Sequence, residues 1–313
     1  MADDEFLAAL YAEARRRGAL VDLGGRAMWR LSGADRVRYL NGQVTNDIRR
    51  VRGDAAMEAC VTTAKGRLCG VIFVSSGAEF LRIDAEGELR ESLTARFGRY
   101  IIADDAVLED VTGEECFFHL IAAAALEAPA GAIVRAAKRY GRAGFDFIAP
   151  IGERERVLKA LGESGVLVPA ELGECLRIEA GVPRWGLELT EETLPPEAGL
   201  DEAAIDYHKG CYIGQEVISR IKSVGHVNRE LAGFTAAAAL SAGMTLHPEG
   251  DPDKNAGVIT SAAWSFGLES WAGLGYLKRG FAGATLIART SAGATVSVQI
   301  RDLPYLISGS SIP

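Results

Sequence analysis

The sequence predicts an α+β protein in which helices cover antiparallel sheets, followed by a small β-barrel at the C-terminal end. Its 313 residues are too many for one simple core. Strand patterns come in pairs and alternate with helical patterns up to about residue 230. Beyond that point Gly, Ala, Ser and Thr become frequent, and short strand patterns follow one another. We therefore expect a region 1–230, built from two interleaved α+β subdomains, and a barrel domain 231–313.

The first element is predicted to be an amphipathic helix over residues 3–17. Its apolar residues recur at helical spacing and share one face, namely Phe6, Leu7, Leu10, Tyr11 and Ala14. Acidic residues stand at its beginning and three arginines at its end, which is the arrangement that the helix dipole favours. Gly18 follows and is expected to end the helix.

The remaining elements are predicted from runs rich in Val, Ile and Phe and from apolar stripes at helical spacing. In region 1–230, strands are expected at 20–23, 27–31, 56–62, 68–74, 79–83, 107–111, 116–122 and 145–149. Helices are expected around 35–41, 89–97 and 157–161. In the barrel domain, strands are expected at 231–235, 256–260, 272–277, 285–287 and 296–300.

Composition and charge exclude several classes of protein. Hydrophobic residues make up 48% and charged residues 24% of the chain, the balance of a folded globular protein. The net charge of −8 argues against a protein that binds nucleic acid through its whole surface, so no direct nucleic-acid contact is expected. The acidic N-terminus does not resemble a secretion signal, and no apolar stretch is long enough to cross a membrane. We expect a cytoplasmic protein.

Five cysteines are spread along the chain: Cys60, Cys69, Cys116, Cys175 and Cys211. Their odd number and wide spacing argue against a disulfide framework. No Cys-x-x-Cys pair occurs, so the sequence predicts no zinc site and no resident iron–sulfur cluster.

The segment 208–216, His-Lys-Gly-Cys-Tyr-Ile-Gly-Gln-Glu, carries the strongest chemical signal. Its two glycines permit a tight loop, and the apolar spacing that follows predicts a helix directly after it. Cys211 would then lie close to a helix N-terminus and beside Lys209, and both features favour a reactive thiolate. The alternative is that Cys211 is a small buried apolar residue, as most free cysteines are.

Residues 209–216 resemble the signature Lys-Gly-Cys-aromatic-x-Gly-Gln-Glu of the YgfZ family at every fixed position. Several other segments support this resemblance. Residues 31–47 resemble the N-terminal block of the family, and residues 65–67 its Gly-Lys/Arg turn. Residues 177–183 and 195–200 are similar to blocks of the glycine-cleavage T-protein, and the end of the chain near 303–305 fits the barrel of this superfamily.

The resemblance implies a T-protein-like ring of domains around a central folate pocket. It implies binding of tetrahydrofolate or a one-carbon derivative, and a role in iron–sulfur cluster assembly or repair that indirectly supports tRNA modification. The expected partners are folate, including its polyglutamylated form, and iron–sulfur client or assembly proteins. Whether the chain is itself an enzyme is left open by the motif.

The resemblance also assigns site residues. Cys211 would be the reactive residue, and Glu179 matches the carboxylate that meets the pterin ring, because a carboxylate can accept two hydrogen bonds from an amino-pyrimidine edge. The other expected folate contacts are Lys209, Tyr212, Gln215, Arg177 and Asn46. By itself Glu179 could equally be a solvated helix residue, Arg177 a packing residue and Asn46 a turn cap. Trp29 and Trp185 are candidates for stacking on the pterin, with core packing as the alternative.

The main alternative is a folate-dependent aminomethyltransferase of the T-protein type. In that branch the strand that corresponds to residues 68–74 carries acidic residues, one of them catalytic, whereas here the strand has none. The T-protein-like block 195–200 favours the alternative. A third hypothesis is a folate-sensing or docking module in which Cys211 has no chemical role.

Basic residues gather around and after the signature: Lys209, Arg220, Lys222, His226 and Arg229. We expect them to form a positive rim beside the pocket that attracts the anionic polyglutamate tail of cellular folates. The alternative is ordinary surface charge on a solvated helix.

Overall fold

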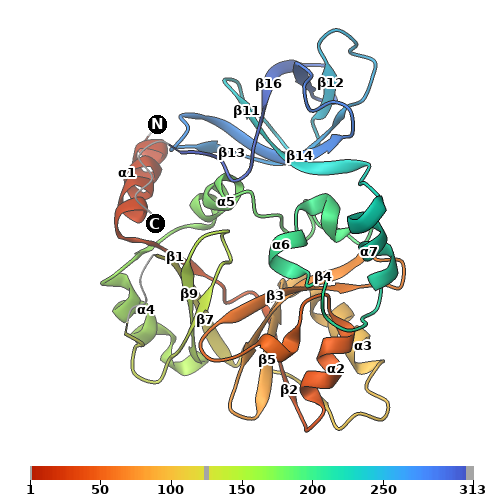
Figure 1. Ribbon diagram of the computed structural model, residues 1–313. Coiled ribbons are helices and arrows are strands. Elements are labelled where there is room, and N and C mark those ends of the chain that lie inside the picture. The colour runs from red at the N-terminus through yellow and green to blue at the C-terminus, as the bar shows by residue number, and fades with distance from the viewer. Residues whose placement is uncertain (1, 123–126, 308–313) are drawn as a thin grey trace.

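The predicted fold class is confirmed. The computed structural model describes residues 2–122 and 127–307 and contains two five-stranded sheets and a closed six-stranded barrel (Figure 1). Almost all strand pairs are antiparallel; β1 with β10 is the parallel pair among the named strands. None of the described helices is long and apolar enough to cross a membrane.

The first sheet has the strand order β10-β1-β7-β9-β8. Its strands are β1 (Ala19–Asp22), β7 (Glu115–Ile121), β8 (Ile133–Ala137), β9 (Gly144–Pro150) and β10 (Val166–Leu167). Helix α4 (Arg154–Gly162) inserts Val157 and Leu161 into the phenylalanine-rich core of this sheet. Helices α1 (Ala2–Arg17) and α5 (Ala170–Glu179) pack together beside β1 and β10 through residues such as Tyr11 and Leu172.

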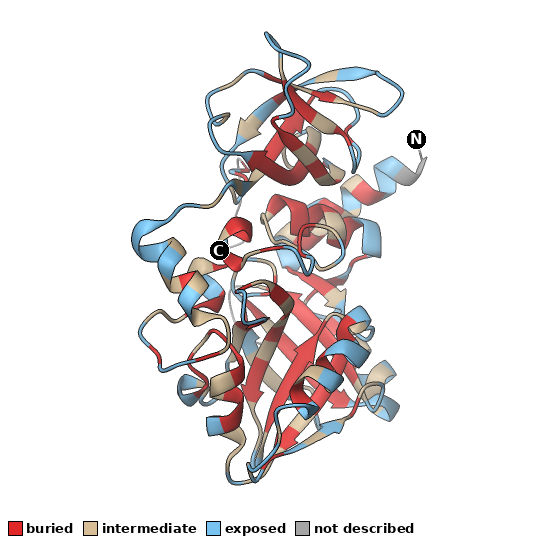
Figure 2. Cartoon of the chain, turned by 90° about the vertical axis from the view of Figure 1, so that its right-hand side faces the viewer, coloured by how far each residue is buried: buried red, intermediate tan, exposed pale blue. Residues whose placement is uncertain are grey.

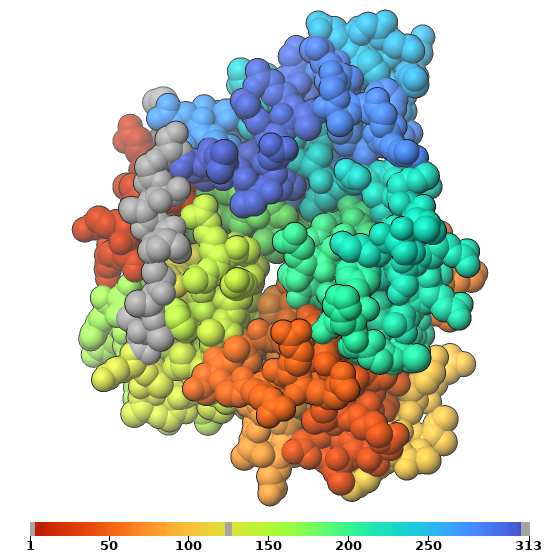
Figure 3. Space-filling model, in the orientation of Figure 1, coloured from red at the N-terminus to blue at the C-terminus, as the bar shows by residue number. Residues whose placement is uncertain are grey.

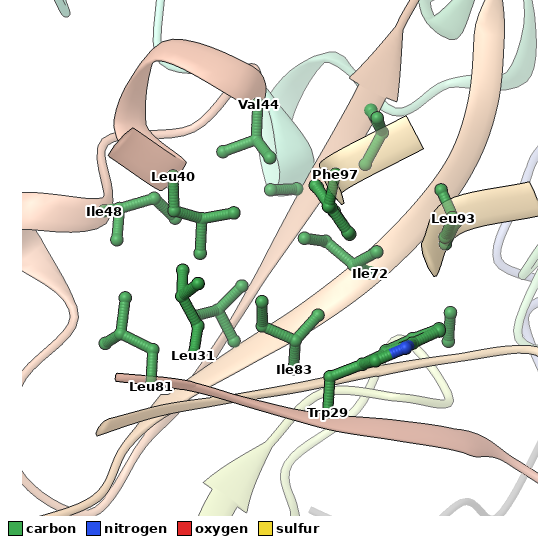
Figure 4. Close-up of a cluster of buried hydrophobic side chains, with 14 of the residues drawn as sticks. Trp29, Leu31, Leu40, Val44, Ile48, Ile72, Leu81, Ile83, Leu93 and Phe97 are labelled. Carbon is green, nitrogen blue, oxygen red and sulfur yellow. The ribbon is translucent and has the colours of Figure 1, made fainter. Parts of the chain in front are cut away.

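The second sheet has the strand order β3-β4-β5-β2-β6. Its strands are β2 (Ala27–Ser32), β3 (Ala56–Thr62), β4 (Leu68–Ser76), β5 (Phe80–Ala85) and β6 (Val107–Asp110). Helices α2 (Arg36–Gln43) and α3 (Arg90–Gly98) cover one face of it, and Figure 4 shows the apolar core between this face and the helices. The chain therefore starts in the first sheet, builds the second and returns to the first.

The C-terminal barrel closes in the order β11-β14-β13-β12-β15-β16. Its strands are β11 (Arg229–Ala236), β12 (Thr245–Pro248), β13 (Gly257–Ser265), β14 (Ser270–Lys278), β15 (Leu286–Arg289) and β16 (Thr295–Arg301). Short side chains suit a barrel this small: a Cβ on Gly275 would lie 2.2 Å from the carbonyl oxygen of Val258. In Figure 2 the barrel and the sheets are buried on their inner faces, whereas the connecting helices are exposed.

A connecting segment joins the α+β region to the barrel. It contains α6 (Asp201–Ala204) and α7 (Gln215–Val224). Among the described residues there are also four short 3-10 helices, Ile48–Arg50, Gly87–Leu89, Ile151–Glu153 and Pro195–Ala198. Strands β8, β10 and β12 and helix α6 were not predicted from the sequence, because each is too short to show a clear apolar period. Helix α5 was not predicted either, although Leu172, Cys175 and Leu176 recur in it at helical spacing.

Candidate functional site

A cavity of about 1180 Å³ lies at the centre of the molecule, where the two sheets and the barrel meet. Figure 3 shows it as a hollow between the orange, yellow-green and teal segments. Its wall is formed by β3 and β4, by the start of α5, by the loop 180–185 and by the ends of β14 and β16. A cavity of this size can hold a drug-sized ligand.

The pleat of the second sheet decides which side chains reach the cavity. On β3 and β4, Ala59 and Ile72 point into the core under α2 and α3. Glu58 and Phe73, one position along on each strand, lie directly opposite each other and point to the other face, where both line the cavity. Asp84 on β5 is the next residue in the same row, because it pairs with Phe73 on its other side.

Two arginines cover Phe73. The guanidinium of Arg139 lies 4.1 Å from the centre of the Phe73 ring, and that of Arg26 lies 5.9 Å from it. Arg139 donates to both carboxylate oxygens of Asp84, at 2.8 and 2.9 Å, and to Asp146 on β9. Burial alone would lower the pKa of Arg139, but the carboxylates of Asp146 and Asp84 raise it. This buried network fastens the two sheets together behind the cavity wall.

Glu58 differs from the other charged groups of this wall. Within the described part of the chain, its carboxylate has no hydrogen-bond partner, and no cation lies within 4 Å of it. Its side chain is half-buried. Burial raises the pKa of Glu58 to about 7, although Arg139 and Arg26 both act to lower it. The sequence offered one signal for this residue, a single acid on an otherwise apolar strand.

Arg177 lines the cavity, as a site residue should, but its guanidinium is used within the protein. It donates to Glu188 at 3.0 Å, to Glu174 at 2.6 Å and to Ser261 of the barrel at 2.9 Å. These bonds fix the loop that carries Trp185 between α5 and the barrel. These contacts favour the alternative interpretation, in which Arg177 is a packing residue between α5, the loop and the barrel.

Glu179 is not among the residues that line the cavity. Its carboxylate is 2% exposed and accepts hydrogen bonds from Tyr11 at 2.9 Å and from Ser265 at 2.6 Å. Residues two apart on a helix point about 200° apart, so Glu179 and Arg177 face opposite sides of α5. In this structure the Glu179 carboxylate, which was expected to meet the pterin ring, joins α1, α5 and the barrel.

Lys209 is also buried, with 5% of its surface exposed. Its ammonium donates to the main-chain carbonyls of Asn41 at 2.6 Å, Val44 at 2.7 Å and Asn46 at 2.8 Å. Three carbonyls match the three N–H donors of an ammonium group. Burial lowers the pKa of Lys209 to about 8, and Asp47 acts against this shift. Lys209 therefore anchors the signature loop, and it does not line the cavity.

The other signature residues surround this anchor. The Tyr212 ring lies 5.2 Å from the Lys209 ammonium, and the Tyr212 hydroxyl is buried without a hydrogen-bond partner among the described residues. The Asn46 side chain donates to the carbonyl of Glu58 at 2.8 Å and to that of Ala203 at 3.1 Å. Asn46, Lys209, Tyr212 and Gln215 are all absent from the cavity wall.

Cys211 is exposed and lies in the loop before α7. Gly214 caps this helix with a φ of 91°, and a Cβ there would lie 2.4 Å from the carbonyl of Thr63, so only glycine fits. The Thr62 hydroxyl donates to the carbonyl of Ile213 at 2.5 Å. The loop thus rests on the turn between β3 and β4, outside the cavity wall.

Strand β3 connects the two halves of the predicted site. Glu58, Cys60 and Thr62 follow one another at intervals of two residues and lie on the same face of the strand. Glu58 lines the cavity, and Thr62 contacts the Cys211 loop. Four residues of strand span about 13 Å. The sequence predicted a single site that contains both the folate pocket and Cys211. In the structure the cavity and the exposed Cys211 thiol are separate and lie near opposite ends of β3.

Comparisons with known proteins agree with this architecture. A solved T-protein, the glycine-cleavage aminomethyltransferase of Bartonella henselae, superposes with a TM-score of 0.83 over 96% of this chain and 89% of its own, at 17% identity. The tRNA-modifying protein YgfZ of Serratia proteamaculans is 27% identical over 92% of this chain and 93% of its own length. The chain is similar to YgfZ in sequence and is folded like a T-protein. An aminomethyltransferase of Rubrobacter xylanophilus is 27% identical over 94% of this chain and 82% of its own length. No family model matches the chain.

The two tryptophan candidates have different surroundings. Trp29 is fully buried in the core of the second sheet, where its ring nitrogen donates to Thr94 at 2.8 Å. Trp185 lines the cavity and is partly buried. Only Trp185, of the two, is positioned to contact a bound ligand.

The predicted basic rim of the YgfZ-like site does not border the cavity. None of Lys209, Arg220, Lys222, His226 and Arg229 lines it. Arg229 instead pairs with Glu197 at 3.0 Å and covers the ring of Tyr276. The cations that do line the barrel side of the cavity are Lys278, Arg279 and Arg301.

Proposed function

We propose that this protein binds tetrahydrofolate, or a one-carbon derivative of it, in the central cavity. The proposal includes a YgfZ-type accessory role in iron–sulfur cluster assembly or repair, and through that role in tRNA modification. It draws its main support from one observation: a cavity of about 1180 Å³ enclosed by two sheets and a barrel with the fold of a folate-system enzyme.

The lining of the cavity suits a ligand of this chemistry. Trp185, Phe73 and Tyr140 provide aromatic surface, and Glu58 provides a hydrogen-bond acceptor. Charged side chains such as Arg26, Lys138 and Arg184 also line the cavity, so the ligand is expected to meet aromatic surface together with polar groups that can fix its orientation.

Cys211 is proposed as the reactive residue. It is exposed, unlike Cys60, Cys116 and Cys175, which are buried. An exposed thiol outside the cavity can meet a client or assembly protein while folate stays bound inside. Under this proposal the chain is a folate-dependent adaptor with a thiol at its surface, and the iron–sulfur protein is its partner.

Calorimetry with reduced protein tests the folate part of the proposal. Tetrahydrofolate should bind, and Trp185→Ala should weaken binding by about tenfold, since stacking and burial of an aromatic ring contribute on the order of 1–2 kcal/mol. Trp264→Ala is the matched control, because Trp264 lies on the barrel away from the cavity wall. Wild-type protein that binds no folate would refute the proposed function.

A further inference from the structure

The cavity contains one carboxylate whose surroundings differ from those of its neighbours. Glu86 is paired with Arg26 at 2.7 Å, and Glu174 with Arg177 at 2.6 Å. Asp22 is paired with Arg154. Glu202, Glu230 and Asp302 are exposed at the edges of the cavity. Glu58 is half-buried and has neither an ion pair nor a hydrogen bond within the described residues.

An unpaired, half-buried carboxylate is costly, because burial removes water that no protein donor replaces. Here the nearest cations are fully used elsewhere. Arg139 donates to Asp84 and Asp146, and Arg26 to Asp84 and Glu86. The Glu58 carboxylate is therefore free to accept hydrogen bonds from a molecule inside the cavity.

The backbone holds Glu58 in place for this purpose. It lies within β3, opposite Phe73, and its own carbonyl accepts the hydrogen bond from Asn46. A side chain on a rigid strand is positioned more accurately than one on a loop. Glu58 also lies on the same wall as Val71 and Phe73, whose apolar side chains offer no competing donor.

We propose that Glu58, and not Glu179, is the cavity carboxylate that recognises the ligand, by accepting two hydrogen bonds from adjacent N–H groups. This inference rests on the proposed function and deepens it. The matching chemistry in a reduced folate is the ring N–H and the neighbouring amino group of its aminopyrimidine edge. A carboxylate accepts such a pair with both oxygens and fixes the orientation of the ring.

Ionisation of Glu58 follows from its surroundings. The charged and titratable groups around it are Arg26, Arg139, Asp84, Glu86 and Glu202, with the Cys60 thiol on its own strand. Burial raises the pKa of Glu58 to about 7, so the carboxylate is mostly ionised at pH 8 and mostly protonated at pH 6. Only the ionised form accepts two hydrogen bonds. Ligand affinity should therefore fall by about tenfold as the pH is lowered from 8 to 6.

The experiment measures binding of two probes, tetrahydrofolate and a tetrahydropterin without the aminobenzoyl-glutamate tail, by calorimetry under reducing conditions. Glu58→Gln should weaken both by on the order of 10- to 100-fold at pH 8 and should abolish the pH dependence. The matched controls are Glu202→Gln, which removes an exposed carboxylate of the same cavity, and Glu179→Gln. Both variants should retain the wild-type pH dependence of binding.

Three outcomes would overturn the inference. The first is equal affinity of wild-type protein for tetrahydropterin at pH 6 and pH 8, a result that needs no variant to fold. The second is a Glu58→Gln variant that binds like the wild type. The third is loss of binding in Glu179→Gln alone. In each of these cases tetrahydrofolate still binds the wild type, so the proposed function survives, whereas absence of wild-type binding would refute both.

Discussion

The ammonium of Lys209 donates a hydrogen bond of 2.8 Å to the main-chain carbonyl of Asn46, 163 residues earlier in the chain. This bond joins the signature loop to the segment that precedes β3. Asn46 continues the connection, since its side chain donates to the carbonyl of Glu58. The signature loop and the cavity wall are therefore held by one chain of contacts.

Replacing Lys209 should destabilise the protein. Lys209→Met keeps the length of the side chain but leaves three carbonyls without their donor, so we expect a loss of about 2–4 kcal/mol in the free energy of unfolding. Urea titration followed by fluorescence measures it. Lys222→Met, an exposed lysine on α7, is the control and should change stability by less than about 0.5 kcal/mol. Equal stability of the two variants would contradict the anchoring role.

Cys211 should alkylate faster than the other four cysteines in the native protein. It is the exposed one, whereas Cys60, Cys116 and Cys175 are buried and burial raises the pKa of each thiol. Brief iodoacetamide treatment followed by peptide mass spectrometry gives the order of labelling. Cys211→Ser should remove the fast phase. A Cys69 that labels first would show that the reactive thiol was assigned to the wrong residue.

Acid should weaken the contact between the two sheets through Asp146. Burial alone would raise the pKa of this carboxyl, but Arg139 and His119 lower it to about 2. Because the pKa in the folded state lies below the unfolded value of about 3.8, its contribution to stability is present above that value and is lost as the pH falls toward 2. Asp146→Asn leaves the Arg139 charge with fewer partners and should cost about 3–5 kcal/mol at pH 7. Thermal unfolding at pH 7 and pH 3 tests both statements, and a variant as stable as the wild type would contradict them.

The protein should fail to replace a T-protein in a reconstituted glycine-cleavage assay. By the resemblance to the T-protein, β4 matches a strand that carries acidic residues in that branch, whereas the cavity-facing residues of β4 include the apolar Val71 and Phe73. Glu58 lies opposite Phe73 but on β3, the neighbouring strand. Production of methylene-tetrahydrofolate at rates comparable to those of a T-protein would contradict this prediction and support the aminomethyltransferase alternative.

Polyglutamylated tetrahydrofolate should bind more tightly than the monoglutamate at low salt. The responsible cations are now expected to be Lys278, Arg279 and Arg301, because these line the barrel side of the cavity. The difference should shrink at about 0.5 M salt, where the screening length is only a few ångströms. Arg279→Ala should reduce it, and the control Arg220→Ala should not. If Arg220→Ala reduced the difference and Arg279→Ala did not, the polyglutamate tail would instead bind at the surface of α7.

The sequence alone determined the elements and the general architecture. Periodicity placed β3, β4 and every barrel strand except β12 within a few residues, because a buried sheet face demands alternating apolar side chains. The change in texture near residue 230 predicted a run of short strands, and β11 (Arg229–Ala236) is the first of them. The signature around Cys211 pointed to the loop and helix that the structure contains.

Only the tertiary structure decided which polar side chains meet in the cavity. The helical period shows that Arg177 and Glu179 lie on different faces of α5. It does not show which of these faces is covered by α1 and the barrel. The same packing buries Lys209 against distant carbonyls and leaves Glu58 unpaired, since strand pairing and domain contacts join residues far apart in sequence. Burial and partners, which set the charge and the availability of a side chain, come from those long-range contacts.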